Sequence, residues 1–313
     1  MIQTSILLSP KGEPLSQNGE GLVTASGSTY PVIDGVPILL DGERSLFTPG
    51  EVVQRQYVEE KVSRVRGVVR RVLPGMSLSI GTRERYAEFA RRIGQGRVLV
   101  IGGGLLGNGA EPLIDSALEV VESDVYLSPR VDVVCDGHDL PFGDSTFDGV
   151  VLQAVLEHVL DPPRVVAEAH RVLRQGGLVY AETPFLQAVH EGPFDFTRWT
   201  ELGHRRLFNM FGEIDSGVLA GPATTLLWAI CYFARSLPRR GSRLPLILEK
   251  LAVLTFFWLK HLDHILIKHP GATDAASAVY FLGEKAERPV DDREILASYG
   301  GAIGRPVRRE GSQ

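Results

Sequence analysis

Cysteine is scarce in this chain, and charge of neither sign dominates it. Only 2 of the 313 residues are cysteine, Cys135 and Cys231, and they form no Cys-x-x-Cys pair. A disulfide framework and a cysteine-rich zinc site are therefore excluded, and we expect a reducing, cytoplasmic setting. Lys and Arg number 33 against 38 Asp and Glu, a net charge of −5, so no general positive field draws in nucleic acid and none is expected as a partner.

Long hydrophobic runs are also missing. The uncharged run from Ser216 to Ala234 has the length of a membrane span, but glycine, proline and threonine interrupt it. We interpret it as a strand, a loop and a buried helix, with a span as the less favoured alternative. The first ten residues have no basic flank and no small-residue cleavage site, so no secretory signal is expected. With 44% hydrophobic residues, the chain can bury a large core.

The chain begins with a small β unit, residues 1–45. Asp34-Gly35 lies between two apolar runs, which predicts a tight hairpin turn, and residues 22–25 can supply a third strand. Residues 46–96 follow a helical period and predict one helix from Pro49 to the Pro74-Gly75 break and a second over 83–93. We interpret this segment as a helical linker or lid.

A buried strand, a glycine loop and a helix follow in that order. The strand covers 98–101, the helix is expected over 110–118, and glycines occupy 102, 103, 104, 107 and 109. Such a loop makes a tight turn and lets a ligand approach backbone N–H groups. Its spacing also fits a dinucleotide site, because Glu122 follows Gly102 by 20 residues. The loop alone therefore leaves two reaction classes open.

Strands and helices alternate beyond this loop, which predicts an α/β fold with a doubly wound sheet. Strands are expected over 118–121, 131–135, 145–152, 178–182 and 214–220, with helices over 162–173 and 201–211. Polar residues follow the strands: Glu122 and Asp124, then Asp136-Gly137-His138, then Gln153-Ala154. Counted from Asp124, which ends the second strand, only seven residues, 124–130, precede the third strand, too few for an ordinary crossover helix.

This ordered series, residues 97–185, resembles class I S-adenosylmethionine-dependent methyltransferases of the ubiquinone and menaquinone group, methyltransferase type 11. The resemblance implies a Rossmann-like sheet of seven strands whose last strand, 278–285, is antiparallel. It also implies S-adenosyl-L-methionine as cofactor. The family assigns Gly102, Gly103 and Gly104 to the methionine and ribose end, Asp124 or Glu122 to the ribose hydroxyls, Asp136, Gly137 and His138 to the adenine edge, and Gln153 and Ala154 to the sulfonium.

The sequence also departs from the pattern of this family at several positions. Val100 stands where the family has an acid, and the third glycine is displaced by one position, to Gly107. Glu157-His158 matches a family Leu-Glu-His that more often holds the fold than does chemistry. The N-terminal unit resembles a small zinc-ribbon-like domain, but Ser9 and Ala25 replace its cysteines, so no metal site is expected.

The segment after the fifth strand carries the candidate acid–base groups, His190, Glu191, Asp195 and Arg198. His190, oriented by Asp195 or Glu191, can take a proton from the acceptor, and Arg198 can bind an anionic group of it. The alternative is that Asp195 and Arg198, three residues apart, pair and shape the loop. A similar pattern occurs in methyltransferases of surface-glycan and natural-product pathways.

The whole chain then divides into residues 1–45, 46–96, a methyltransferase domain over 97–285 with an apolar helical insertion at 221–268, and a polar tail, 286–313. The apolar helix over 244–265 is expected to pack on another helix or a second subunit, with a lipid-linked acceptor as the alternative. We expect methyl transfer to a hydroxyl or other nucleophile of a small-molecule, natural-product or glycan acceptor. The alternatives are an NAD-dependent oxidoreductase or epimerase and an inactive binding protein.

Overall fold

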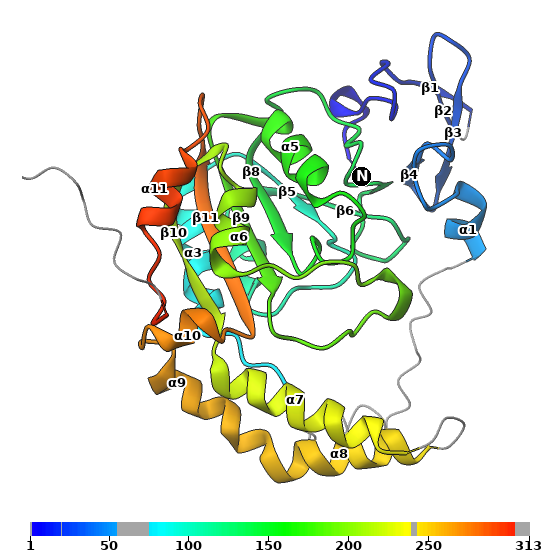
Figure 1. Ribbon diagram of the computed structural model, residues 1–313. Helices are drawn as coiled ribbons and strands as arrows, with labels where there is room; N and C mark the ends of the chain where they lie inside the picture. The colour runs from blue at the N-terminus through cyan, green and yellow to red at the C-terminus, as the bar shows by residue number, and fades with distance from the viewer. Residues whose placement is uncertain (1, 20, 55–74, 239–242, 304–313) are drawn as a thin grey trace, which may run out of the picture.

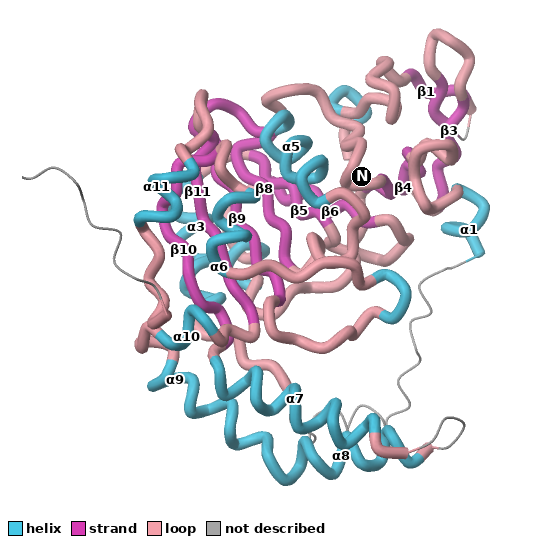
Figure 2. The backbone as a smooth tube through the Cα atoms, viewed as in Figure 1, coloured by secondary structure: helices cyan, strands magenta, loops and turns pink. Residues whose placement is uncertain are grey.

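A computed structural model describes residues 2–19, 21–54, 75–238 and 243–303. Its strands form one mixed sheet (Figures 1 and 2) in the order β1-β2-β3-β4-β7-β6-β5-β8-β9-β11-β10. The strands are β1 (Ser16–Asn18), β2 (Gly21–Val23), β3 (Thr29–Ile33), β4 (Val36–Leu39), β5 (Arg97–Ile101), β6 (Glu119–Asp124), β7 (Val133–Cys135), β8 (Phe147–Gln153), β9 (Leu173–Pro184), β10 (Phe211–Ala220) and β11 (Ala278–Lys285).

Helices cover both faces of this sheet. They are η1 (Thr4–Ile6), α1 (Pro49–Gln54), α3 (Thr82–Ile93), α4 (Glu111–Ile114), α5 (Pro162–Val172), η2 (Gly192–Phe194), α6 (Glu201–Leu207), α7 (Pro222–Ser236), α8 (Leu244–Phe256), η3 (Phe257–Leu262), α9 (Asp263–Leu266), α10 (Gly271–Asp274) and α11 (Asp292–Ala297). The helix expected from Pro49 runs into residues 55–74, which lie outside the described residues.

Seven strands, from β7 to β10 in the sheet order, have the predicted Rossmann-like arrangement. β7, β6, β5, β8 and β9 pair in parallel, and β11 pairs antiparallel with both β9 and β10. Parallel strands buried on both faces carry continuous apolar runs, as in residues 98–101 of β5 and 150–152 of β8. The predicted fold class, including the reversed last strand, is therefore confirmed.

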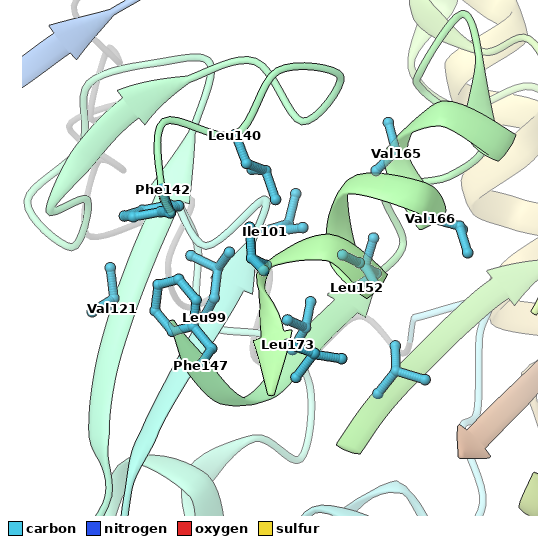
Figure 3. Close-up of a cluster of buried hydrophobic side chains, with 14 of the residues drawn as sticks. Leu99, Ile101, Val121, Leu140, Phe142, Phe147, Leu152, Val165, Val166 and Leu173 are labelled. Carbon is cyan, nitrogen blue, oxygen red and sulfur yellow. The ribbon is translucent and has the colours of Figure 1, made fainter. Parts of the chain in front are cut away.

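Each face of the sheet buries its own core. Alternate residues of β5 point to opposite sides, so that Leu99 and Ile101 pack with Val165 and Val166 of α5 (Figure 3), whereas Val98 packs with Phe89 of α3. Because β5, β6, β8 and β9 run parallel, their carboxyl ends lie at one common edge of the sheet.

The N-terminal strands continue this sheet. β4 pairs in parallel with β7, through Ile38 opposite Val134 and Leu39 opposite Cys135. Asp34 and Gly35 have φ angles of 51° and 83°, which form the predicted tight turn between β3 and β4. The division of the chain into domains stays a prediction, but this unit shares a sheet with the rest.

Hydroxyl groups organise two turns of the N-terminal β unit. Ser9 is buried, and its Oγ accepts the N–H groups of Lys11 at 3.3 Å and Glu13 at 3.1 Å. Thr24 is also buried, and its Oγ1 accepts the N–H of Ser28 at 3.0 Å. Side-chain oxygens therefore stabilise both turns by the hydrogen bonds typical of Ser and Thr.

Two connections on the glycine-loop side are short. The helix expected over 110–118 was wrong in length, because α4 is only four residues long. Its end has a local cause: the Ser116 hydroxyl donates to Leu113 O at 2.5 Å, which competes with continued helix. Residues 125–132, all described, link β6 to β7 without a helix, as the spacing predicted.

The apolar insertion forms a helical layer beside the sheet, with α7 and α8 packed together (Figure 1). Asp263, fully buried, accepts the N–H groups of Gly221, Ala223 and Thr224 at 2.9–3.1 Å and so caps α7 from a distant segment. α8 buries only part of its surface, since Leu246, Ile247 and Leu251 are about half exposed. None of the helices within the described ranges is long and apolar enough to span a membrane.

The segment after β11 packs against the domain through α11. α11 contacts α6, and Arg206 donates to Asp292 Oδ1 at 3.0 Å. Residues 304–313 of the predicted polar tail lie outside the described residues.

Candidate active site

The glycine loop packs closely against the ends of β6 and β8. Gly102 has a φ of 76°, and a Cβ there would lie 2.5 Å from Val155 Cγ2. A Cβ on Gly103 would lie 2.9 Å from Glu122 Cβ, and one on Gly104 would lie 2.6 Å from Asp124 Oδ2. Only glycine fits at these three positions, because any side chain would displace Val155, Glu122 or Asp124.

The two candidate ribose acids have different surroundings. Asp124 Oδ2 accepts the Gly104 N–H at 2.9 Å, and its Oδ1 accepts the Tyr126 N–H at 3.2 Å. Glu122 forms an ion pair with Arg130. Burial raises the pKa of both carboxyl groups, against the backbone hydrogen bonds to Asp124 and the Arg130 charge beside Glu122. Asp124 accepts a hydrogen bond from the backbone of the glycine loop, whereas Glu122 packs against Gly103, so both acids lie at the loop.

Asp136 joins the sheet to the N-terminal unit. Its Oδ2 accepts the Ser45 hydroxyl at 2.5 Å, and its Oδ1 lies 2.5 Å from His138 Nδ1. The other ring nitrogen of His138 accepts the Asp161 N–H at 3.1 Å, so the His138 ring bridges the loop to the start of α5. Burial opposes ionisation of Asp136, but the hydrogen bonds from His138 and Ser45 lower its pKa. Gly137 packs against Val165 of α5.

Gln153 and Ala154 end β8 in a constrained geometry. Gln153 Nε2 donates to Glu182 Oε2 at 2.7 Å and to Asn108 O at 3.1 Å, while its Oε1 accepts the Tyr86 hydroxyl at 3.1 Å. Ala154 has a φ of 54°, a left-handed conformation that a non-glycine residue adopts at some energetic cost. A cavity of about 40 Å³ opens here, lined by Gly102, Glu122, Gln153, Tyr86 and Val100 among others.

His190 and Asp195 meet at the same edge, after β9. The His190 N–H donates to Asp195 Oδ2 at 2.9 Å, and His190 Nδ1 lies 3.5 Å from that oxygen. Burial opposes ionisation of Asp195, but hydrogen bonds from Arg198 and His190 lower its pKa to about 2. Glu191 is exposed and begins the single turn η2, so Asp195 is the carboxylate that faces His190.

Arg198 uses all its donors within the protein. Its guanidinium contacts both oxygens of Asp195 and donates to the carbonyls of Gln187, Ala188 and Thr197. A guanidinium has five N–H groups, so none remains for an anionic acceptor group. Of the two alternatives for this pair, the geometry favours loop shaping.

Glu157 is the most unusual group at this edge. Its side chain is 0% exposed, and neither carboxylate oxygen has a hydrogen-bond partner in the described part of the chain. Its Oε1 lies 3.6 Å from His158 Nε2 and 3.9 Å from His190 Nε2. Burial raises the pKa of Glu157 to about 8 and lowers that of His158.

Sequence reasoning missed several of these contacts. It did not pair Glu157 with His190, although both follow the carboxyl ends of neighbouring parallel strands, β8 and β9, and this was the available signal. Ser45, Tyr86 and Glu182 were also missed, because each reaches the site from a distant segment.

Taken together, this edge offers a glycine cradle that admits no Cβ, an acid touching that cradle, and a histidine beside a carboxylate on the adjacent strand. Such a class I, Rossmann-like site suits a nucleoside-containing cofactor next to an acceptor that gives up a proton.

Comparison with known proteins agrees with this class. Residues 109–181 match the family described as methyltransferase domain. Demethylmenaquinone methyltransferase of Symbiobacterium thermophilum is 36% identical over 87 residues, 26% of this chain and 35% of that protein. A probable S-adenosylmethionine-dependent methyltransferase of Mycolicibacterium smegmatis is 35% identical over 109 residues, 32% of this chain and 42% of that protein.

A solved structure with a related fold is the 1,6-didemethyltoxoflavin-N1-methyltransferase of Burkholderia thailandensis, at 15% identity and a TM-score of 0.42, covering 87% of this chain and 99% of that one. The chain spans less than half the length of the curated relatives described above. The predicted resemblance of the central segment to class I S-adenosylmethionine-dependent methyltransferases is confirmed.

Proposed function

We propose that the protein is a methyltransferase that uses S-adenosyl-L-methionine. The observation that carries this proposal is the glycine cradle of residues 102–104, whose loop is held by Asp124 at the end of β6. When bound, the cofactor supplies a methyl group made electrophilic by its sulfonium. Gly102 and Gly104 would hold its methionine and ribose end, Asp124 its ribose hydroxyls, and the Asp136-Gly137-His138 turn its adenine edge.

His190 is the proposed base in this reaction. Its side chain is 25% exposed, so an acceptor can reach the ring, and Asp195 beside Nδ1 stabilises the charged form that follows proton uptake. Arg198 positions Asp195 and does not touch the acceptor. The chain's own residues thus bind and orient both partners, which supplies the proximity that an in-line transfer needs.

The proposed acceptor is a small molecule or glycan, in which a hydroxyl or another nucleophile receives the methyl group. Tyr232 of α7 donates its hydroxyl to Val189 O at 2.6 Å, and the Trp228 ring centroid lies 6.2 Å from that of His190. The insertion therefore supplies an aromatic wall next to the base. The relatives' names include a quinone methyltransferase, which is compatible with a ring-shaped acceptor.

Titration calorimetry with S-adenosylhomocysteine and with NAD tests the function directly. We expect binding of S-adenosylhomocysteine and a loss of at least about tenfold in affinity in Asp124→Ala, whereas Asp144→Ala, an exposed acid elsewhere, binds as the unaltered chain. Binding of NAD without S-adenosylhomocysteine would refute the proposal in favour of an oxidoreductase. Binding of neither would favour a non-catalytic protein.

We also propose that the exposed apolar face of α8 pairs with a second copy of the chain. Leu244, Ile247, Leu251 and Leu254 recur at helical spacing and are about half exposed. Sedimentation of the full chain should show a dimer, and Leu251→Glu should give a monomer. A monomer at micromolar concentration without the substitution would refute this pairing and favour a lipid-linked acceptor there.

A further inference from the structure

Three side chains converge at the carboxyl edge of the sheet. The proposed methyl transfer does not require all three of them. Glu157 and His158 follow β8, and His190 follows the neighbouring strand β9. One ligand atom from each lies within 4.8 Å of the others. The set combines a carboxylate with two imidazoles, which is a donor set for zinc and similar divalent metals.

We propose that Glu157, His158 and His190 bind a single divalent transition-metal ion of the zinc type. The sequence alone predicted no metal here. The proposal concerns the three side chains themselves, and metal binding can be measured without methyl transfer.

The distances fit an ion better than they fit hydrogen bonds. The Glu157 Oε1 atom lies 3.6 Å and 3.9 Å from the two Nε2 atoms, beyond the usual hydrogen-bond range. Two ligand atoms each about 2.1 Å from a tetrahedral zinc ion lie about 3.4 Å apart. The two carboxylate–imidazole distances therefore need only a small contraction to fit an ion, and the ligand atoms of all three groups lie within 4.8 Å of one another.

Burial gives Glu157 a need for a positive partner. Its side chain is fully buried, and both oxygens lack hydrogen-bond partners among the described residues. An unpaired carboxylate is costly in such a place, whereas a coordinated cation satisfies it. Arg198 does not supply this partner, because its donors are all directed at Asp195 and at carbonyl groups.

Both histidines are oriented as metal ligands are. His158 Nδ1 lies 2.6 Å from the carbonyl oxygen of Phe194, so it must carry the proton, and Nε2 keeps its lone pair toward Glu157. His190 Nδ1 lies 3.3 Å from Ala188 O and 3.5 Å from Asp195 Oδ2, and its Nε2 also faces Glu157. An oxygen that accepts a hydrogen bond from the other ring nitrogen is the arrangement that fixes the tautomer of ligating histidines.

Three protein ligands leave one position open, as in catalytic zinc sites. The His158 and His190 side chains are 21% and 25% exposed, so water or an acceptor oxygen can enter. If the proposed methyl transfer holds, an ion there would bind the acceptor oxygen and lower its pKa. With the ion bound, His190 cannot act as the base, because the ion would occupy its Nε2 lone pair. His190 is the base only in the metal-free chain.

The test uses the full chain without an affinity tag, stripped with EDTA and titrated with Co²⁺ by visible absorption and with Zn²⁺ by calorimetry. We expect one tightly bound ion per chain and absorption bands of a tetrahedral or five-coordinate Co²⁺. Glu157→Gln and His190→Ala should each weaken binding by more than about tenfold, and Asp195→Asn by about tenfold through the orientation of His190.

The matched control is the double variant His261→Ala/His264→Ala, which removes two exposed histidines whose rings lie 6.3 Å apart on another surface. It should bind the ion as the unaltered chain does. Circular dichroism checks folding, and if Glu157→Gln does not fold, the partly exposed His190→Ala carries the test. The proposal is overturned if the unaltered chain binds no ion, or if His190→Ala binds the ion as tightly as the unaltered chain does. Either failure leaves cofactor binding by the glycine loop untouched.

Discussion

His204 allows a quantitative test of how a buried imidazole responds to acid. The ring lies on α6 with 0% exposure, and its Nε2 is 2.9 Å from Thr183 Oγ1 on β9. Its Nδ1 is buried without a hydrogen-bond partner among the described residues. Burial alone lowers the pKa of His204 to about 3, so the ring is neutral in the folded chain at pH 7.

The sign of the effect follows from proton binding. Between pH 6.5 and about 3, the unfolded chain protonates this histidine and the folded chain does not, so stability falls as pH falls. Above pH 6.5 the ring is neutral in both the folded and the unfolded chain, so this loss of stability is absent. At pH 5 the loss is about 1.5 pH units times 1.36 kcal/mol, or about 2 kcal/mol, a large share of the stability of an ordinary domain.

The assay is urea unfolding followed by tryptophan fluorescence, at pH 7.5 and pH 5, for the unaltered chain and for His204→Gln. Glutamine can still bond to Thr183 but does not titrate, so the stability gap between the two chains should shrink or reverse by about 2 kcal/mol on acidification. Other titrating groups cancel in this difference. His261→Gln, at an exposed position, is the control and should show no such change. An unchanged gap for His204→Gln would refute the assignment of a neutral buried ring.

Three further variants probe the site and its supports. Gly104→Ala places a methyl group 2.6 Å from Asp124 Oδ2 and should weaken S-adenosylhomocysteine binding at least about tenfold by calorimetry, with Gly271→Ala, which has open space, as control. Arg198→Ala removes the guanidinium partner of the 2%-exposed Asp195 side chain, which keeps only its contacts with His190, and should cost about 3 kcal/mol in urea unfolding, with little rescue by lysine. Asp263→Ala leaves three buried N–H groups of the α7 start without their acceptor and should cost about 3 kcal/mol; an unchanged midpoint would contradict the capping role.

Local sequence signals were sufficient for most of the sheet. The strands over 97–101 and 147–153 are short apolar runs, and Asp34-Gly35 determines a turn by its own φ preferences. The helix after the glycine loop was predicted too long, because its apolar residues continue to Leu118 while Ser116 ends it through a side-chain bond.

Long-range contacts were not readable in the same way. No local pattern indicates that β4 pairs with β7 or that Ser45 reaches Asp136, since 91 residues separate those two side chains. For Asp195 and Arg198 the sequence left two roles open, and only the count of occupied guanidinium donors separates them. Pairing across the sheet is decided by packing, which no local pattern encodes.

The short connections on the glycine-loop side explain why the N-terminal unit matters to the site. With one turn in α4 and no helix between β6 and β7, this corner of the sheet lacks the cover that a crossover helix gives. Phe47 lies there instead. Its ring is 5.4 Å from that of Tyr126 in the β6–β7 loop and 5.8 Å from that of Phe194 in the segment that follows β9.

The segment from Ser45 to Phe47 thus contacts both halves of the candidate site. Ser45 holds Asp136 on the cofactor side, and Phe47 packs on Phe194, whose carbonyl orients His158 on the acceptor side. A shift of this segment would therefore move the adenine-edge acid and the proposed metal ligand together. Phe47→Ala should consequently weaken S-adenosylhomocysteine binding and Zn²⁺ binding in one variant, although Phe47 is a ligand of neither. If calorimetry shows that the variant changes neither affinity, the N-terminal unit is only an extension of the sheet.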